Sequence, residues 1–294
     1  MADSVWLITG ASSGFGNSIA LEALQRGYKV IATARNSSKL GSLEAAGAAT
    51  LNLDVTSSDE VLAAKLAEAN TIYGKITHVI NCAGYLLEGA VEEATNAEVF
   101  AVFNTNVFGC YNIARASTPY LRKAAASAPA GSTTALANFG SLGSWQSGAG
   151  VAHYCSTKWA VSGLTEGLRE ELKPFGIDVT VIEPGYTRTG FLIRNSDGGD
   201  HRILTARTLS EYDGTAVAAA KQAMSAYSGA QPGNVDKCAT VIVDVLTKKG
   251  VAEGKEVPLR LALGIDTLAV IRGKCESTVK LLNEWEEVSS SVMY

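Results

Sequence analysis

"LITGASSGFG", residues 7–16, places three glycines directly after an apolar run and at the start of an amphipathic stretch. Glycine at positions 10, 14 and 16 lets the backbone turn tightly and approach a pyrophosphate closely, and it lets the following helix pack on the strand. The N-terminus of that helix offers free N–H groups and the positive end of a dipole to the phosphates. The pattern T-G-x-x-x-G-x-G therefore predicts a dinucleotide-binding loop.

Apolar, strand-like runs alternate with helix-length amphipathic segments over the first 185 residues. The strand-like runs are 5–9, 29–34, 49–54, 77–84, 133–140 and 177–185, and the helical patterns lie near 15–26, 38–46, 57–73, 96–125 and 151–174. This alternation indicates βαβ units, and runs that are apolar on both faces are typical of parallel strands covered by helices on both sides. We therefore predict an α/β fold, a Rossmann-like doubly wound parallel sheet of about seven strands.

The rhythm breaks at residue 186. Residues 186–230 are irregular and polar, apart from a helical pattern at 209–229, and the α/β alternation resumes with a helix at 234–249, a strand at 257–263 and a helix near 265–288. A long excursion inside a compact domain is usually a lid or a binding loop. We expect a single domain over residues 1–294, with 186–230 as a substrate-lid segment.

Composition and charge exclude several classes of protein. A net charge of −4 without a basic run argues against nucleic-acid binding. Five cysteines without a C-x-x-C motif indicate free thiols in a reducing compartment, and three widely spaced histidines give no metal site. The start of the chain does not read as a secretory signal, and no run of 18 apolar residues exists. We expect a cytoplasmic protein with no membrane partner and no metal.

The end of the second strand-like run bears on the choice of cofactor. In "IATARN" an acid that would bind the ribose 2′-hydroxyl of NAD is missing, since Ala34 stands there and Arg35 follows. A guanidinium suits a bidentate grip on a 2′-phosphate, which favours NADPH/NADP+ over NADH. The further predicted cofactor-binding residues lie in the glycine loop and at the carboxyl ends of strands: Gly10, Ser12, Ser13, Gly14, Phe15, Gly16, Asp54, Val55, Asn81, Ala83, Gly84, Pro184, Gly185, Thr187 and Thr189.

A phenol and an amine lie four residues apart in "AHYCSTKWAV", residues 152–161, and so share a helix face as Tyr154 and Lys158. A phenol has a pKa near 10, and a cation within about 4–6 Å favours its ionised form. Charge that develops on a carbonyl oxygen needs donors already in place, and the Ser141 and Tyr154 hydroxyls suit that task. The spacing alone is a weak signal, and the surrounding motifs decide its interpretation.

Together these residues resemble the short-chain dehydrogenase/reductase superfamily in its short, single-domain, NADPH-preferring form. The resemblance spans nearly the whole chain. It rests on the glycine loop, the N-x-A-G turn at 81–84, Asn106 in "NVFG", Ser141 placed 13 residues before Tyr154, the pair Tyr154-x-x-x-Lys158, and Pro184-Gly185. One departure is Cys82, where the family often has a second Asn, and it affects packing more than chemistry.

The resemblance implies roles for four catalytic residues. Tyr154 would donate a proton to the substrate carbonyl oxygen while the nicotinamide delivers a hydride to the carbonyl carbon. Lys158 would bind the nicotinamide ribose hydroxyls and lower the pKa of the phenol, and both Tyr154 and Lys158 are predicted cofactor-binding residues. Ser141 would hydrogen-bond the carbonyl, and Asn106 would fix a water that links Lys158 to solvent. The implied protein is an NADP-dependent oxidoreductase, a carbonyl reductase or alcohol dehydrogenase.

Two other classes remain as alternatives. A catalytically silent NADP(H)-binding sensor or scaffold could use the same fold, although such proteins are expected to lose the Ser, Tyr or Lys. The loop spacing and the chain length disfavour an epimerase or dehydratase of the longer sister form.

Substrate and assembly are less defined by the sequence. Trp145, Tyr186 and Phe191 are the predicted walls of a pocket for an apolar or aromatic ketone or aldehyde. The resemblance also suggests a homodimer or homotetramer paired through the helix that carries Tyr154.

Overall fold

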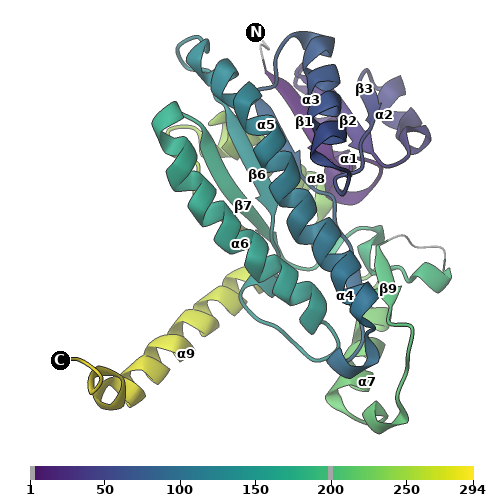
Figure 1. The fold of residues 1–294 in the computed structure, drawn as a ribbon, viewed down its shortest axis with the longest axis vertical. Coiled ribbons are helices and arrows are strands. Elements are labelled where there is room, and N and C mark those ends of the chain that lie inside the picture. The colour runs from purple at the N-terminus through teal and green to yellow at the C-terminus, as the bar shows by residue number, and fades with distance from the viewer. Residues whose placement is uncertain (1–3, 198–200) are drawn as a thin grey trace.

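Seven parallel strands form the central sheet of the computed structural model, which describes residues 4–197 and 201–294 (Figure 1). The strand order is β3-β2-β1-β4-β6-β7-β11. The strands are β1 (Val5–Thr9), β2 (Lys29–Ala34), β3 (Ala49–Asn52), β4 (His78–Asn81), β6 (Ala135–Phe139), β7 (Asp178–Pro184) and β11 (Arg260–Leu263). The predicted Rossmann-like, doubly wound sheet of a single α/β domain is confirmed.

Helices cover both faces of this sheet. α1 (Gly14–Gln25), α2 (Gly41–Ala45) and α8 (Val235–Thr247) lie on one face, and α3 (Asp59–Tyr73), α5 (Gly109–Ala126) and α6 (Ala152–Leu172) lie on the other. The other helices of the described residues are α4 (Asn96–Phe103), α7 (Ala216–Tyr227) and α9 (Ile265–Ser290). Side chains alternate along β1, so Trp6 and Ile8 pack with α1, α2 and α8, whereas Val5 and Leu7 pack with α3, α5 and α6. Strands buried on both faces in this way have the continuous apolar character seen in the sequence.

The order of the strands creates the site for a ligand. The chain adds β2 and β3 on one side of β1 and then returns to place β4 on the other side. The connections after β1 and β4 therefore leave in opposite directions, and open α/β sheets bind ligands at this switch point, beyond the carboxyl ends of the strands. The glycine loop follows β1 at this point.

Local chemistry explains where several helices begin and end. The Ser58 hydroxyl accepts a hydrogen bond from the Val61 N–H at the start of α3, and Gly74 ends that helix with a φ of +75°. Thr95 and Glu98 form a capping box at the start of α4, in which each side chain accepts the other residue's N–H.

Two predicted helices differ from those in the structure. The pattern at 96–125 contains α4 and α5, which are joined by a π-helical segment, Asn104–Phe108. Within the pattern at 209–229 only α7 is an α-helix, preceded by a short 3-10 turn at Ser210–Tyr212, because Asp213 and Gly214 interrupt the helix.

Segment 186–230 contains short strands that the sequence did not reveal. Residues 198–200 of this segment lie outside the described residues. β9 (Arg202–Leu204) pairs with β5 (Leu86–Glu88), and β8 (Thr187–Arg188) pairs with β10 (Gly233–Asn234). These two-stranded pairs are too short to show a hydrophobic period, so tertiary contact alone defines them. Across the two described ranges, no helix is both long enough and apolar enough to span a bilayer.

His78 is a fully buried ionisable group on β4. Its ring stacks on Trp6 with centroids 4.4 Å apart, and its Nε2 lies 3.3 Å from the Leu246 carbonyl oxygen. Burial lowers the pKa of His78 to about 4. The folded protein therefore holds this ring neutral at a pH where an unfolded chain would protonate it.

This burial predicts a pH-dependent loss of stability. In the unfolded chain His78 has a pKa of about 6.5, so between pH 6.5 and pH 4 only the unfolded chain takes up a proton on this ring. The free energy of unfolding therefore falls by about 3 kcal/mol as the pH drops from 6.5 to 4. Urea unfolding across this range should show a smaller pH slope for His78→Asn than for the native chain. Equal slopes in the two proteins would contradict the prediction, whatever the absolute stability of the variant.

Candidate active site

The glycine loop lies directly against the turn that follows β4. Gly10 has a φ of +63°, and a Cβ there would lie 2.9 Å from the backbone of Ala83. A Cβ on Gly16 would lie 2.6 Å from the Gly10 carbonyl oxygen. The Thr9 hydroxyl also accepts the Cys82 N–H at 3.1 Å. Only glycine fits both positions, and the N-terminus of α1 stays open to an anionic group.

A cavity of about 430 Å³ extends from this loop across the carboxyl ends of the strands. Of the predicted residues, it is lined by Gly10, Ser13, Gly14, Phe15, Gly16, Gly84, Ser141, Tyr154, Lys158, Pro184, Gly185, Tyr186, Thr187, Thr189 and Phe191. The structure thus brings the glycine loop, the Tyr154–Lys158 pair and the turn after β7 to one cavity.

Lys158 lies one helical turn after Tyr154 on α6, and its side chain is buried, with 7% of the residue exposed. Its Nζ donates to the Phe139 carbonyl oxygen at 2.8 Å and lies 5.5 Å from the centroid of the Tyr154 ring. Burial lowers the pKa of Lys158 to about 8. The amine is therefore poised to exchange a proton near neutral pH.

Tyr154 experiences two opposing effects. Burial raises the pKa of its phenol above the ordinary value, while a hydrogen bond with Ser141 acts to lower it. Lys158 is not among the groups that shift the pKa of Tyr154 in this structure, so the expected lowering by Lys158 is not seen and desolvation dominates. The Ser141 hydroxyl also accepts the Gly143 N–H at 3.1 Å, which fixes it at the start of a short 3-10 turn.

Asn106 is held in the π-helical segment between α4 and α5. Its side chain accepts the Tyr85 N–H at 3.0 Å and donates to the Tyr85 carbonyl at 2.8 Å and to the Thr157 hydroxyl at 3.1 Å. The side chain therefore ties the turn after β4 to α6, one residue before Lys158. Single π-bulges of this kind often occur at functional sites.

Eight predicted site residues lie outside the cavity lining formed by the described part of the chain. They are Ser12, Arg35, Asp54, Val55, Asn81, Ala83, Asn106 and Trp145. Arg35 is exposed just after β2, and Asp54 lies two residues beyond β3 with its carboxylate accepting the Thr56 N–H at 2.9 Å. Asn81 is buried and donates to Asn138 at 2.8 Å.

Trp145 does not line the cavity, so its predicted place in the pocket wall is wrong. Its indole N–H donates to the buried carboxylate of Glu183 at 2.8 Å, and the Arg260 guanidinium packs over its ring at 4.6 Å. Arg260 also bonds Glu183 at 2.6 Å. A buried indole N–H needs a hydrogen-bond acceptor, and here the acceptor is Glu183 on β7. Trp145 thus helps to hold the loop after β6.

Segment 186–230 supplies aromatic groups next to the Tyr154 ring. The Phe191 ring lies 5.8 Å from the Tyr154 ring and 6.2 Å from the His201 ring. His201 Nε2 lies 2.8 Å from the Ser13 hydroxyl of the glycine loop. His201 could not be identified as a site residue from the sequence, because a single histidine without a motif carries no signal.

Gln231 is a second cavity residue that the sequence did not reveal. It lines the cavity and is 1% exposed, and neither its amide oxygen nor its amide nitrogen has a partner within the described residues. Its backbone carbonyl accepts the Arg188 Nε–H at 3.2 Å, which holds it near the turn after β7. Buried amides without partners are rare in folded proteins.

Buried ion pairs fasten segment 186–230 to the rest of the domain. Arg202 on β9 donates from Nε and Nη2 to the two carboxylate oxygens of Glu88 on β5, at 2.7 and 2.8 Å. These side chains are 1% and 0% exposed. A bidentate, charge-assisted pair of this kind fixes both partners in one geometry.

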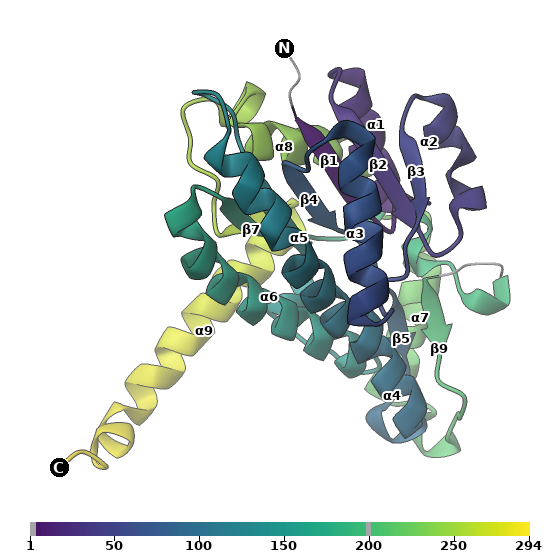
Figure 2. The same ribbon diagram turned by 45° about the horizontal axis from the view of Figure 1, so that its top comes forward.

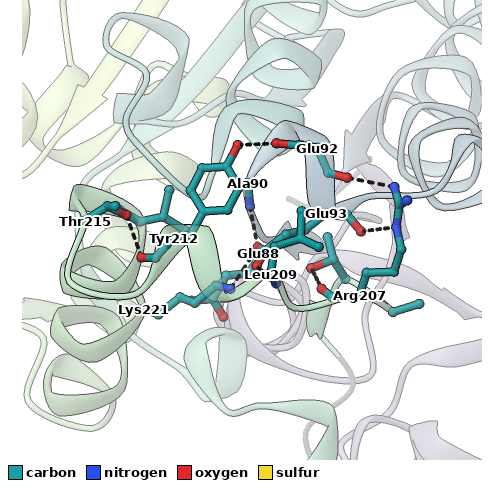
Figure 3. Close-up of polar contacts among 12 residues, drawn as sticks. Glu88, Ala90, Glu92, Glu93, Arg207, Leu209, Tyr212, Thr215 and Lys221 are labelled. Atoms are coloured by element: carbon teal, nitrogen blue, oxygen red, sulfur yellow. Dashed lines mark hydrogen bonds and ion pairs between the residues drawn. The ribbon is translucent and has the colours of Figure 1, made fainter.

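A second group of contacts extends this attachment (Figure 3). The Glu93 carboxylate accepts from Lys221 at 2.9 Å and from the Leu209 N–H at 3.1 Å, while Arg207 donates to the Glu92 carbonyl at 2.7 Å. These contacts join the residues after β5 to α7 and to the chain before it. The walls of the cavity are therefore held by charged groups remote from Tyr154.

Known proteins are similar to this chain in sequence and in fold. The short chain dehydrogenase family profile matches residues 4–198. Oxidoreductase BOA17 of Botryotinia fuckeliana is 32% identical over 290 residues, which is 97% of each chain. An NADPH-dependent 1-acyldihydroxyacetone phosphate reductase of Schizosaccharomyces pombe is 33% identical over 64% of this chain and 61% of its own.

A solved structure is similar along the whole chain. The crystal structure of a short-chain dehydrogenase from Streptomyces avermitilis covers 100% of both chains, with a TM-score of 0.84 and 34% identity. The protein belongs to the short-chain dehydrogenase/reductase family. It is an oxidoreductase of that family, whose members bind a nicotinamide cofactor.

The Glu88–Arg202 pair gives a stability prediction. Arg202→Met leaves a buried carboxylate without its partner and should cost about 3–5 kcal/mol, whereas the double variant Glu88→Leu/Arg202→Met should recover much of that loss. Hydrogen exchange should locate the loss in residues 201–227 and around β5.

Arg115→Met is the matched control. It removes an ion pair with Asp59 in which both side chains are more than half exposed, so it should cost less than about 1 kcal/mol. If Arg202→Met were as mild as this control, segment 186–230 would not depend on the buried pair.

Proposed function

We propose that this protein is an NADPH-dependent oxidoreductase that transfers a hydride between nicotinamide and a ketone or aldehyde, with Tyr154 as the general acid/base. The observation that carries this proposal is the Tyr154 phenol, hydrogen-bonded to Ser141 above the buried Lys158 amine, in a cavity that also reaches the glycine loop. When bound, the nicotinamide cofactor supplies the hydride to the carbonyl carbon, or accepts it in the reverse direction.

In this proposal the side chains control the proton and the charge. Tyr154 donates its phenolic proton to the carbonyl oxygen, and the Ser141 hydroxyl stabilises the charge that develops there. Lys158 holds the ribose hydroxyls of the cofactor and favours the phenolate after the proton has left. Asn106 acts by position, since it joins the turn after β4 to Thr157 beside Lys158.

The residues fit a dinucleotide. A Cβ at Gly10 or Gly16 would collide with neighbouring backbone, so glycine at these positions lets the loop turn tightly at the N-terminus of α1, whose N–H groups suit a pyrophosphate. Arg35 is exposed to solvent just after β2, where it would bind a 2′-phosphate. Position 34 is Ala and not an acid, so no carboxylate would bind the 2′-hydroxyl of NAD. A relative of this chain carries the description NADPH-dependent, which supports the same cofactor preference.

The lining of the cavity favours an apolar or aromatic substrate. Phe191 and Tyr186 lie at the cavity with Met224 and Val270. Segment 186–230 would act as the lid of this pocket, because it places Phe191 over Tyr154. Gln231 would offer the substrate a polar contact beside these apolar side chains.

Removal of the phenol tests the chemistry. Tyr154→Phe should lower kcat for reduction of the best ketone or aldehyde in a panel by about 10²- to 10⁴-fold, because general acid catalysis is lost. Consumption of NADPH measures this loss, and NADPH binding should persist. Tyr111→Phe, which changes an exposed tyrosine, should retain full activity.

Other outcomes of that experiment are informative. Full activity of Tyr154→Phe would contradict the role of the phenol. If the native protein bound NADPH and turned over no member of a broad panel of carbonyls and alcohols, the silent sensor would replace the enzyme as the better interpretation.

Removal of the guanidinium tests the cofactor preference. Loss of a charge-assisted hydrogen bond costs about 1.5–3 kcal/mol, so Arg35→Ala should reduce kcat/KM for NADPH by about 10- to 150-fold and leave the value for NADH nearly unchanged. The ratio of the two values, measured with one substrate, gives the result independently of protein stability. A native enzyme that prefers NADH would show that Arg35 does not select the cofactor.

A further inference from the structure

Helix α9 begins in the domain and then leaves it. Its first turn is anchored, since Asp266 accepts the Tyr186 N–H at 2.7 Å and Thr267 is fully buried. Every residue from Arg272 to Tyr294 is exposed. Both views show the helix projecting away from the sheet, with no segment of the described residues packed along its outer length (Figures 1 and 2).

The projecting part of α9 carries an apolar stripe. Its members recur at intervals of three or four residues, which places them along one side of a helix. They are Ile271, Cys275, Val279, Leu282 and Trp285. Val279, Leu282 and Trp285 are 56%, 62% and 56% exposed. A continuous exposed stripe of this kind is typical of an interaction surface.

A projecting helix of on the order of five turns is only marginally stable without a packed face. Its own contacts are weak, because the ion pair between Lys280 and Glu284 spans 3.8 Å and is exposed to solvent. Most helical stability in proteins comes from packing of the apolar side against another element. The stripe therefore needs a partner that extends along the helix.

The charges on α9 indicate what that partner is. Residues 272–280 carry three basic groups and one acidic group, a net charge of +2, whereas residues 284–287 carry three glutamates, a net charge of −3. Two copies of α9 packed antiparallel would place the basic half of each against the acidic half of the other. Packed parallel, like charges would lie together.

The positions of two charges agree with the antiparallel arrangement. Arg272 and Glu286 are separated by 14 residues, or two heptads, and so lie on the same edge of the apolar stripe. In an antiparallel pair, positions on that edge face each other, so Arg272 of one copy meets Glu286 of the second copy at both ends. The midpoint of this register is Val279, where the two-fold axis would pass.

We propose that the outer part of α9 is a self-association surface, which binds the same helix of a second copy of this chain antiparallel across the stripe Ile271–Trp285. The surface is separate from α6, through which the resemblance suggested pairing. It does not depend on the proposed reaction.

The mass of the full-length protein in solution tests this inference. Leu282→Glu places a charge in the stripe and should shift the sedimentation equilibrium of the protein toward species of half the native mass. Ser277→Glu adds the same charge on the opposite side of the helix and should keep the native mass. An unchanged mass for Leu282→Glu would overturn the proposal, and circular dichroism would verify that both variants are folded.

Charge reversal tests the orientation. Arg272→Glu and Glu286→Arg should each weaken self-association by tenfold or more. The double variant should regain it, and the two single variants mixed one to one should form a mixed dimer. Failure of both the double variant and the mixture to associate would contradict the antiparallel register.

A cross-link gives a second measure of orientation. In a Cys275→Ser background, Val279→Cys should form a disulfide between copies under mild oxidation, because residue 279 lies at the axis. The native Cys275 should not form one, since it would lie about 12 Å from its equivalent. A native Cys275 cross-link would show a parallel pair instead.

Discussion

The close approach of two backbone turns sets the geometry of the whole site. Gly10 and the residues after β4 meet where β1 and β4 end side by side, and a side chain at Gly10 would collide with Ala83. The Thr9 hydroxyl joins the same two turns. Because a parallel sheet places its carboxyl ends at one edge, this contact aligns the start of α1 with the loops that carry the polar groups.

Buried polar contacts extend this alignment to α6, which carries Tyr154 and Lys158. Asn106 links the turn after β4 to Thr157, and Ser144 donates to the Lys158 carbonyl at 3.0 Å, which fixes α6 against the loop after β6. Within the described residues, the Lys158 amine donates a hydrogen bond only to the Phe139 carbonyl oxygen. A buried amine with so little compensation loses its proton more easily, as its lowered pKa indicates.

Segment 186–230 is held in place mainly by buried charged groups and not by its own secondary structure. Its short strands have little intrinsic stability, and the buried Glu88–Arg202 pair with its neighbours holds it on the domain. Replacement of a buried ion pair by apolar groups often leaves the free energy of unfolding unchanged. The main effect of this pair is therefore to hold Phe191 and His201 in one position. The same segment forms the wall of the cavity, so the charged network acts on the site from a distance.

Short-range patterns predicted the strands along the chain, the glycine loop and the Tyr154–Lys158 pair, because hydrophobic period, turn chemistry and helical spacing are properties of neighbouring residues. The direction of Trp145, the approach of His201 to Ser13 and the unpaired amide of Gln231 could not be read in this way. Each depends on residues distant in the chain: Glu183 for the indole, and the folded segment 186–230 for the other two. The sequence alone determined the class of fold and the chemical groups of the site, and the tertiary structure decided which of them share a cavity, since packing and burial arise only when distant segments meet.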